Sequence, residues 1–253
     1  MFRPRLIPVL LLKNNALVKS VKFKNYNYIG DPINAVKIFN ELKADELVLL
    51  DIDATKERRT ISSEVVRRVG EEANMPFSVG GGITSIDDIQ SLIACGAEKV
   101  ILNSFAIKNI NFLKEASDTF GSSTIVLCID VKKTFFRKKD YVYIRNGKEA
   151  TRYTPVELAK IAQDKGAGEI IIQSINKDGT MAGFDLGLIK SISDSVTIPT
   201  VALGGCRNME DCKSVYKNGR VNGIAAGSFF VYQGLNKGVL INYPSREDII
   251  KIV

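Results

Sequence analysis

The sequence predicts a single domain with the (β/α)8 fold, a closed TIM barrel of parallel strands surrounded by helices. Segments 76–82 and 199–205, about half the chain apart, both begin with proline, continue with an apolar run and contain a Gly-Gly turn. The match extends outward at the same offset, pairing Asp88 with Asp211 and Gly96 with Gly219. A length of 253 residues, 45% of them hydrophobic, suits one such barrel. We therefore expect two half-barrel repeats, at about 1–120 and 121–253.

Short apolar runs rich in β-branched residues are typical of strands that are buried on both faces. Such runs predict strands at 6–12, 46–51, 77–79, 100–102, 124–130, 169–173, 200–203 and 223–226. The intervening segments predict helices that include 32–43, 85–95, 155–165 and 209–218. Ser85, followed by Asp87 and Asp88, indicates a capped helix start. After the fifth strand, 141–144 followed by Asn146-Gly147 predicts an inserted hairpin, a candidate lid over a substrate.

The composition argues against a metal site and a membrane span, and we expect no cofactor. The chain has no histidine, and its four cysteines lack CxxC spacing, so a zinc site or a disulfide framework is not expected. The apolar run near the start is interrupted by Pro8 and ends at Lys13, too short to cross a bilayer. We expect a cytoplasmic protein whose acid/base chemistry depends on carboxylates, lysines or cysteines.

The net charge of +7 indicates an anionic partner. Basic residues cluster after the first and fifth predicted strands, at Lys13, Lys19, Lys22 and Lys24 and at Lys132, Lys133, Arg137, Lys138 and Lys139. These are corresponding loops of the two halves, so both clusters should border the same face of the barrel. Phe23, Phe135 and Phe136 stand among these basic residues, but a basic rim around a pocket favours a phosphorylated small molecule over a groove for nucleic acid.

Glycine and small polar residues mark the ends of the predicted strands, where barrel active sites lie. Glycine lets backbone N–H groups approach a phosphate closely, and a helix that begins there adds a favourable potential. Two such ends in register predict a ligand with a phosphate at each end. The residues concerned include Gly80, Gly81, Gly82, Asn103, Ser104, Asp178, Gly179, Gly204, Gly205, Gly227 and Ser228.

Over nearly its whole length the chain resembles the HisF family, the cyclase subunit of imidazole glycerol phosphate synthase. The resemblance rests on 5–8 (RLIP), 30–32 (GDP), 44–53 (ADELVLLDID), 79–83 (VGGGI), 99–104 (KVILNS) and 177–180 (KDGT). It implies a cyclase that binds a bis-phosphorylated aminoimidazole ribonucleotide derivative. It also implies a HisH-like glutaminase partner, docked on the opposite face, that supplies ammonia.

The resemblance also implies roles for individual residues. One phosphate site would consist of Gly82, Asn103 and Ser104, and the other of Asp178, Gly179, Gly205, Gly227 and Ser228. Lys19 would lie on a mobile loop that closes over the substrate. A ring of charges at the bottom of the barrel, which gates ammonia in the family, would be formed by Arg5, Glu46, Lys99 and Glu169. Each would begin a buried strand, so the two cations and two anions should be paired.

The chain departs from the family at one catalytic position. HisF cyclases use two aspartates, at the ends of the first and fifth strands, as general acid and base. Asp130 matches the second, but Leu11 occupies the position of the first. Leucine cannot transfer a proton, and losing one positioned acid/base group typically lowers the rate by about a hundred- to ten-thousandfold.

Three hypotheses about function follow. In the first, the chain is a diverged HisF paralogue that works with a glutaminase in acetamidino-sugar biosynthesis for surface polysaccharides such as lipopolysaccharide. In the second, it is a genuine histidine-biosynthesis cyclase in which Asp130 suffices, helped by Asp51 or Lys13. In the third, it is a non-catalytic ammonia conduit that activates the glutaminase. A HisA-type isomerase is disfavoured, because it has no use for the four gate residues.

Overall fold

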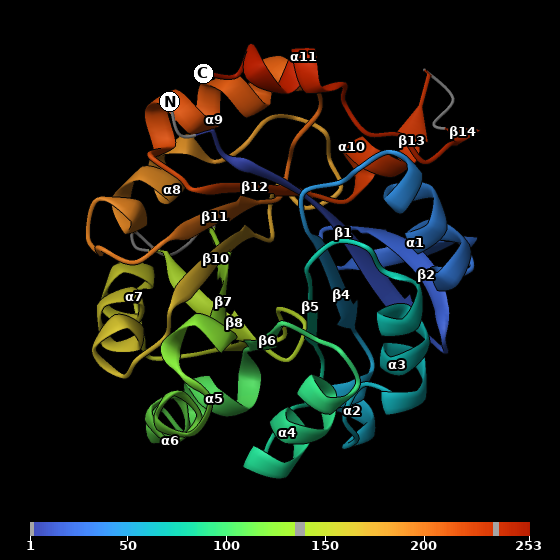
Figure 1. Ribbon diagram of the computed structural model, residues 1–253. Helices are drawn as coiled ribbons and strands as arrows, with labels where there is room; N and C mark the ends of the chain where they lie inside the picture. Colours follow the sequence, from blue (N-terminus) through green and yellow to red (C-terminus); the bar gives the residue numbers. More distant parts are fainter. Residues whose placement is uncertain (1–2, 135–139, 235–237) are drawn as a thin grey trace.

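The computed structural model describes residues 3–134, 140–234 and 238–253. Within them, parallel strands close into a ring in which each strand pairs with its two neighbours, in the order β1-β4-β5-β6-β7-β10-β11-β12 and back to β1 (Figure 1). These strands are β1 (Arg5–Lys13), β4 (Leu47–Asp51), β5 (Phe77–Gly80), β6 (Lys99–Leu102), β7 (Ile125–Lys132), β10 (Glu169–Ser174), β11 (Thr200–Leu203) and β12 (Gly223–Ala226). The predicted (β/α)8 barrel is confirmed, and every predicted strand is present.

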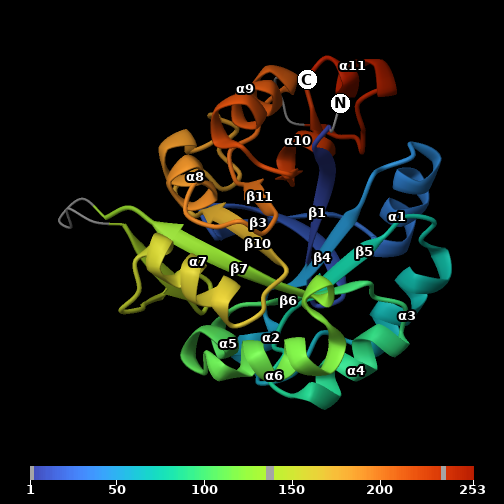
Figure 2. The same ribbon diagram turned by 60° about the vertical axis from the view of Figure 1, so that its left-hand side comes forward.

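Helices surround the ring of strands (Figures 1 and 2). They are α1 (Pro32–Glu41), α2 (Ala54–Glu57), α3 (Ser63–Glu72), α4 (Ile86–Ala94), α5 (Ser104–Lys108), α6 (Asn111–Phe120), α7 (Pro155–Asp164), α8 (Leu186–Ser193), α9 (Met209–Gly219), α10 (Ser228–Val231) and α11 (Arg246–Ile250). The four helices predicted from sequence correspond to α1, α4, α7 and α9. Among the described residues, none of the helices combines the length and apolarity that crossing a bilayer requires.

Two helix starts show how the sequence sets these boundaries. At α4, Ser85 Oγ accepts a hydrogen bond from Asp88 N at 3.1 Å, and Asp88 Oδ2 accepts one from Ser85 N at 3.0 Å. Thr154 and Glu157 form the same reciprocal cap at α7, where Pro155 occupies the first helical position. Each cap satisfies N–H groups that have no partner within the helix, so both helices begin where the sequence predicted.

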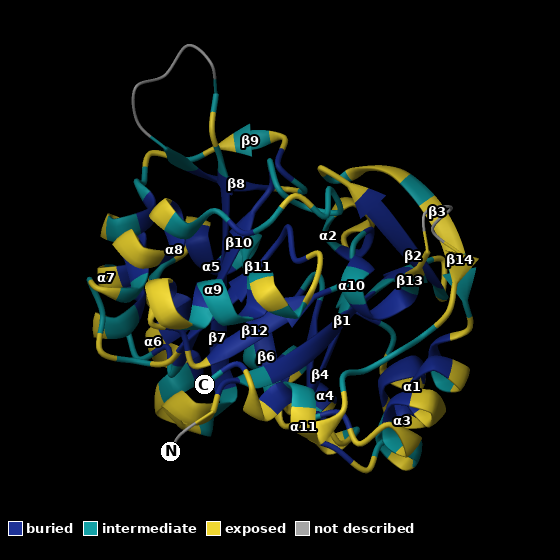
Figure 3. Cartoon of the chain, turned by 90° about the horizontal axis from the view of Figure 1, so that it is seen from above, coloured by how far each residue is buried: buried dark blue, intermediate teal, exposed yellow. Residues whose placement is uncertain are grey.

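The hydrophobic core has two layers, separated by the wall of the barrel. The larger layer lies between strands and helices, and the smaller one fills the barrel interior with side chains such as Ile7, Val48, Val126 and Ile171. Figure 3 shows the resulting pattern, with buried strands inside and helices exposed on their outer faces. The interior is therefore packed, which leaves the ends of the barrel for function.

Two insertions extend the strand ends at the mouth of the barrel. β2 (Ala16–Val21) and β3 (Lys24–Gly30) form an antiparallel extension of β1. β8 (Tyr141–Ile144) pairs with β7 and with β9 (Glu149–Ala150), which confirms the predicted hairpin. A separate short pair, β13 (Tyr232–Gln233) and β14 (Gly238–Val239), precedes the last helix, and a 3-10 turn at Ser122–Thr124 precedes β7.

Candidate active site

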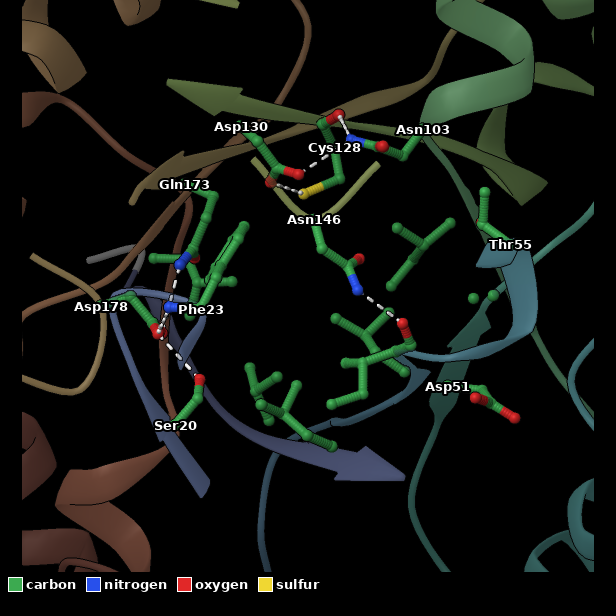
Figure 4. A pocket seen from close by; sticks show the side chains of 18 of the residues that line it. Ser20, Phe23, Asp51, Thr55, Asn103, Cys128, Asp130, Asn146, Gln173 and Asp178 are labelled. Carbon is green, nitrogen blue, oxygen red and sulfur yellow. Dashed lines mark hydrogen bonds between the residues drawn. The ribbon is translucent and has the colours of Figure 1, made fainter. Parts of the chain in front are cut away.

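A cavity of about 570 Å³ opens at the carboxyl ends of the barrel strands. Every residue that the sequence assigned to catalysis, phosphate binding or the substrate loop lines this one cavity: Leu11, Lys19, Gly82, Asn103, Ser104, Asp130, Asp178, Gly179, Gly205, Gly227 and Ser228. Figure 4 shows several of these side chains converging on the cavity from different strands. The binding of phosphate itself stays a prediction.

Gly82 and Gly179 lie on the two sides predicted to hold phosphate, and neither position tolerates a side chain. Their φ angles are +66° and +64°, in the left-handed region that favours glycine. A Cβ on Gly82 would lie 1.8 Å from the carbonyl oxygen of Arg59, and one on Gly179 would lie 1.9 Å from that of Ser20. The glycines therefore allow the chain to pack closely at the cavity wall.

The cavity also contains corresponding strand ends from the two halves of the chain. Ser104 begins α5 directly after β6, and Ser228 begins α10 directly after β12. Ser104 Oγ donates a hydrogen bond to Asn103 Oδ1 at 2.8 Å and accepts one from Arg145 N at 3.0 Å. Both serines line the cavity, and their role in holding phosphate stays a prediction.

Asp130 lies on β7, faces the cavity and is 8% exposed. Burial raises the pKa of its carboxyl group to about 7, although hydrogen bonds from Cys128 and Asn103 favour the charged form. Asn103 Nδ2 donates to Asp130 Oδ2 at 3.2 Å and to the Cys128 carbonyl oxygen at 2.9 Å, which fixes the carboxylate against the wall. A carboxyl group with a pKa near 7 exists in both protonation states at neutral pH, as a general acid or base requires.

Leu11 contributes an apolar surface to the same cavity. On β1 it is paired in register with Leu50 of β4, and both leucines pack against the inner core. The neighbouring carboxylates are already engaged. Asp51 Oδ2 lies 2.6 Å from Arg59 Nη1, while Asp51 Oδ1 accepts hydrogen bonds from two backbone N–H groups. The β1 and β4 side of the cavity therefore has no free carboxylate near Leu11 among the residues described.

Four charged residues form a closed ring at the opposite, amino-terminal end of the barrel. Arg5 contacts Glu46 through one guanidinium nitrogen and Glu169 through the other. Lys99 Nζ lies 3.3 Å from Glu46 Oε1 and 3.0 Å from Glu169 Oε2, so each cation bridges both anions. Ser78 Oγ adds a hydrogen bond to Glu46 Oε1 at 3.1 Å. The expected pairing is confirmed, and the ring covers the floor of the barrel.

Comparison with known proteins agrees with this geometry. The family model described as "Histidine biosynthesis protein" matches residues 5–236. The chain is 44% identical to a Leptospira interrogans protein named "Putative imidazole glycerol phosphate synthase subunit HisF", over 98% of each chain. It is 40% identical to a Pseudomonas aeruginosa protein named "Putative imidazole glycerol phosphate synthase subunit hisF2", over 96% of this chain and 97% of the other. The imidazole glycerol phosphate synthase subunit HisF of Lactococcus lactis is 41% identical, over 92% and 90%.

The chain is a member of the HisF family. Its similarity to the HisF subunits extends over nearly the full length, so it includes both the charged ring and the cavity. The family assignment indicates a cyclase-type enzyme family. The matched region includes position 11, where this chain has leucine.

The loop expected around Lys19 is a β-hairpin between β1 and α1 in this HisF-family chain, and its closure over a substrate stays a prediction. Lys19 was expected on a loop, but it lies in β2, which pairs antiparallel with β1, and it is 3% exposed. Lys19 Nζ donates a hydrogen bond to the Val9 carbonyl oxygen inside the barrel. Burial lowers the pKa of the Lys19 ammonium to about 8, partly offset by Asp178. Its nitrogen would lie 2.6 Å from a Cβ on Gly227, so the ammonium borders the second predicted phosphate site.

A signal for this hairpin was present in the sequence. Asn14 and Asn15 both have positive φ, at 50° and 59°, the conformation of a two-residue hairpin turn in which asparagine is favoured. The remaining basic cluster is only partly described, because Arg137, Lys138 and Lys139 lie outside the described residues.

Sequence reasoning named Asp178 but missed its neighbours Ser20, Phe23 and Gln173, and it did not assign Asn146 to the cavity. Asp178 Oδ2 accepts hydrogen bonds from Ser20 Oγ at 2.9 Å and from Phe23 N at 3.2 Å, and Gln173 also donates to this carboxylate. Burial raises the pKa of Asp178 despite these contacts. Asn146, in the turn between β8 and β9, donates to the Ile52 carbonyl oxygen at 2.7 Å, which ties the hairpin across the mouth.

Replacing Glu46 by Gln should destabilise the fold by about 3 kcal/mol, because Arg5 and Lys99 would then share a single anion in a partly buried ring. Urea unfolding of both chains measures the difference in the free energy of unfolding. Glu71→Gln is the matched control, since Glu71 forms an exposed i,i+4 pair with Arg67 and its loss should change stability by less than about 1 kcal/mol. Equal, small losses in the two variants would contradict a buried ring.

Proposed function

We propose that the chain is a HisF-type synthase subunit that binds a ligand with a phosphate at each end and takes ammonia from a HisH-like glutaminase. The observation that carries the proposal is the combination of an intact charged ring with Leu11 opposite an intact Asp130. The ring is the feature that ammonia entry needs, while the cavity lacks half of the acid/base pair that cyclisation uses. The chain therefore still admits ammonia to the barrel, and its rate of cyclisation is lowered.

The two walls of the cavity differ in the groups that they offer for proton transfer. Asp130 offers a carboxyl group that can exchange a proton near neutral pH, whereas Leu11 and Leu50 offer none. Proton transfer at two positions of a substrate needs two groups in hydrogen-bond reach, so a ligand held by its phosphates meets only one of them. Slow cyclisation is the direct consequence.

A diverged role accounts for this combination best. If ammonia is delivered into the barrel but cyclisation is slow, the ammonia can serve a different acceptor, such as a sugar amidotransferase that builds an acetamidino group for a surface polysaccharide. The combination of Leu11 at the mouth with an intact ring at the other end of the barrel supports this hypothesis. Flanking genes for sugar modification would favour it, and flanking histidine-pathway genes would oppose it.

Two other functions keep a specific observation in their favour. A genuine histidine-pathway cyclase agrees with the similarity to HisF of Lactococcus lactis. It would need a replacement for the missing aspartate, yet Asp51 is held by Arg59, and Lys13 Nζ lies 3.2 Å from Asp53 Oδ2. A non-catalytic conduit agrees with Leu11, but it gives no reason for the buried, cavity-facing Asp130.

Co-purification tests the glutaminase partner. The tagged chain, expressed with the HisH-like glutaminases of its own organism, should retain one of them through size-exclusion chromatography at micromolar concentration. Glu169→Lys reverses the charge of one member of the ring and should lower the glutamine-dependent transfer of ammonia. Glu71→Lys, which makes the same change outside the ring, should not. A chain that stays alone with every candidate would refute the partner.

A further inference from the structure

Few positive charges of the cavity are free to meet an anionic ligand. Among the described residues, the lining includes three cations and four carboxylates: Lys19, Arg58 and Arg59, and Asp51, Asp88, Asp130 and Asp178. A ligand with a phosphate at each end brings further negative charge, which cations or N–H donors have to compensate. The availability of the three cations therefore decides how the two phosphates can be held.

Two of these cations already have partners. Arg59 Nη1 lies 2.6 Å from Asp51 Oδ2, and Arg59 Nε lies 2.7 Å from Glu57 Oε2. Lys19 is buried, its ammonium is hydrogen-bonded inside the barrel, and it borders the second predicted phosphate site, at Gly227. Neither cation is thus free to serve the first predicted site.

Arg58 is the remaining cation of the lining, and it is exposed. Within residues 3–134, 140–234 and 238–253, its side chain has no hydrogen bond and no ion pair. Arg59 would have to leave two carboxylates in order to reach a ligand, whereas Arg58 has no such contact to break. The free positive charge at the mouth is therefore that of Arg58.

The chain places Arg58 beside the first predicted phosphate site. Arg58 ends α2 and directly precedes Arg59, whose carbonyl oxygen packs so closely on Gly82 that a Cβ there would lie 1.8 Å from it. Figure 4 shows Thr55 of α2 on the same side of the cavity as Asn103, another predicted member of this site. A long side chain that starts one residue from the contact with Gly82 can therefore extend to a phosphate held there.

We infer that Arg58 binds the phosphate at the Gly82 end of the ligand and attracts the ligand to the mouth. A guanidinium group offers a planar fork of N–H donors that matches two oxygens of one phosphate. Its exposed charge is screened by salt, whereas the buried ammonium of Lys19 at the other end is screened much less. The two phosphate sites are therefore inequivalent, and the Gly82 end is the salt-sensitive one. The inference rests on the proposed function, because it requires a ligand with a phosphate at each end.

Titration calorimetry with ribulose 1,5-bisphosphate, a sugar with a phosphate at each end, tests this role. At about 0.1 M salt, where charges act over about 10 Å, Arg58→Gln should bind the probe roughly 5- to 50-fold more weakly than the unmodified chain. At about 1 M salt, where that range falls to about 3 Å, the difference should shrink to about twofold or less. Arg58→Lys keeps the charge without the fork, so its affinity should lie between those of the other two chains.

The matched control is Arg68→Gln, which removes an exposed arginine on α3 outside the cavity lining and should bind like the unmodified chain. Full affinity in Arg58→Gln, or equal losses in Arg58→Gln and Arg68→Gln, would refute the role of Arg58 and leave phosphate binding standing. A loss of the same size at both salt concentrations would contradict an exposed charge at the Gly82 end. If the unmodified chain does not bind the probe, the proposed function fails and the inference fails with it. Arg58 is exposed, so both of its substitutions should leave the fold intact.

Discussion

Leu11→Asp should raise the ammonia-dependent cyclase turnover of the chain by about a hundred- to ten-thousandfold. The substitution places a carboxyl group on β1 in the cavity that already contains Asp130. Two acid/base groups would then face a ligand whose phosphates are held at the mouth, and a positioned group of this kind contributes about that factor. The measurement is steady-state turnover of the aminoimidazole ribonucleotide with ammonium salts at high pH, where free ammonia replaces the glutaminase.

Leu50→Asp is the matched control for this gain. Leu50 is the register partner of Leu11 and lines the same cavity, so its replacement adds the same charge one strand away. We expect Leu50→Asp to leave turnover low, because the added carboxylate lies on the wrong strand. An equal gain from both variants, or none from Leu11→Asp in a folded protein, would contradict the account of the missing group.

Asp130→Asn should lower any remaining turnover by about a hundred- to ten-thousandfold, because the amide cannot transfer a proton. Phosphate binding should persist, since the predicted phosphate residues lie on other strand ends. Calorimetry with inorganic phosphate and steady-state kinetics measure the two properties separately. Unchanged turnover in this variant would make Asp130 structural, and a complete pathway that works with Asp130→Asn would favour the non-catalytic conduit.

The pH dependence of thermal stability, compared between the unmodified chain and Asp130→Asn, tests the raised pKa of Asp130. Because burial raises this pKa from 3.8 to about 7, the folded chain binds more protons than the unfolded chain between those values. The stabilisation due to the protonated form is complete below about pH 4 and is lost as the pH rises through about 7. Asp130→Asn should therefore gain thermal stability relative to the unmodified chain, by up to several degrees, between pH 4 and pH 7. A constant difference would contradict the raised pKa.

The barrel could be predicted from the sequence because the patterns that indicate each strand and helix lie within short segments of the chain. Each buried strand is a short apolar run, and the Gly-Gly turns after two of them mark corresponding ends, as the ring of parallel strands confirms. Helix starts such as Ser85 carry their own capping residues. The four charges at strand starts were expected to pair because isolated buried charges are unfavourable, and Arg5 and Lys99 indeed bridge both glutamates.

What the sequence did not predict depends on contacts between distant segments. The family resemblance placed Lys19 on a loop, and only the pairing of β2 with β1 brings its ammonium to the Val9 carbonyl oxygen. Asn146 donates a hydrogen bond to the carbonyl oxygen of Ile52, 94 positions away, and no local sequence pattern predicts such a contact.

The most direct test of the central claim is the turnover of the unmodified chain with the aminoimidazole ribonucleotide and ammonium salts at high pH. A barrel that has an intact charged ring and Asp130 but carries Leu11 should cyclise this substrate at a rate at least a hundredfold below an enzyme with both carboxyl groups. Turnover in the range usual for enzymes, about 1 to 1000 per second, would contradict it.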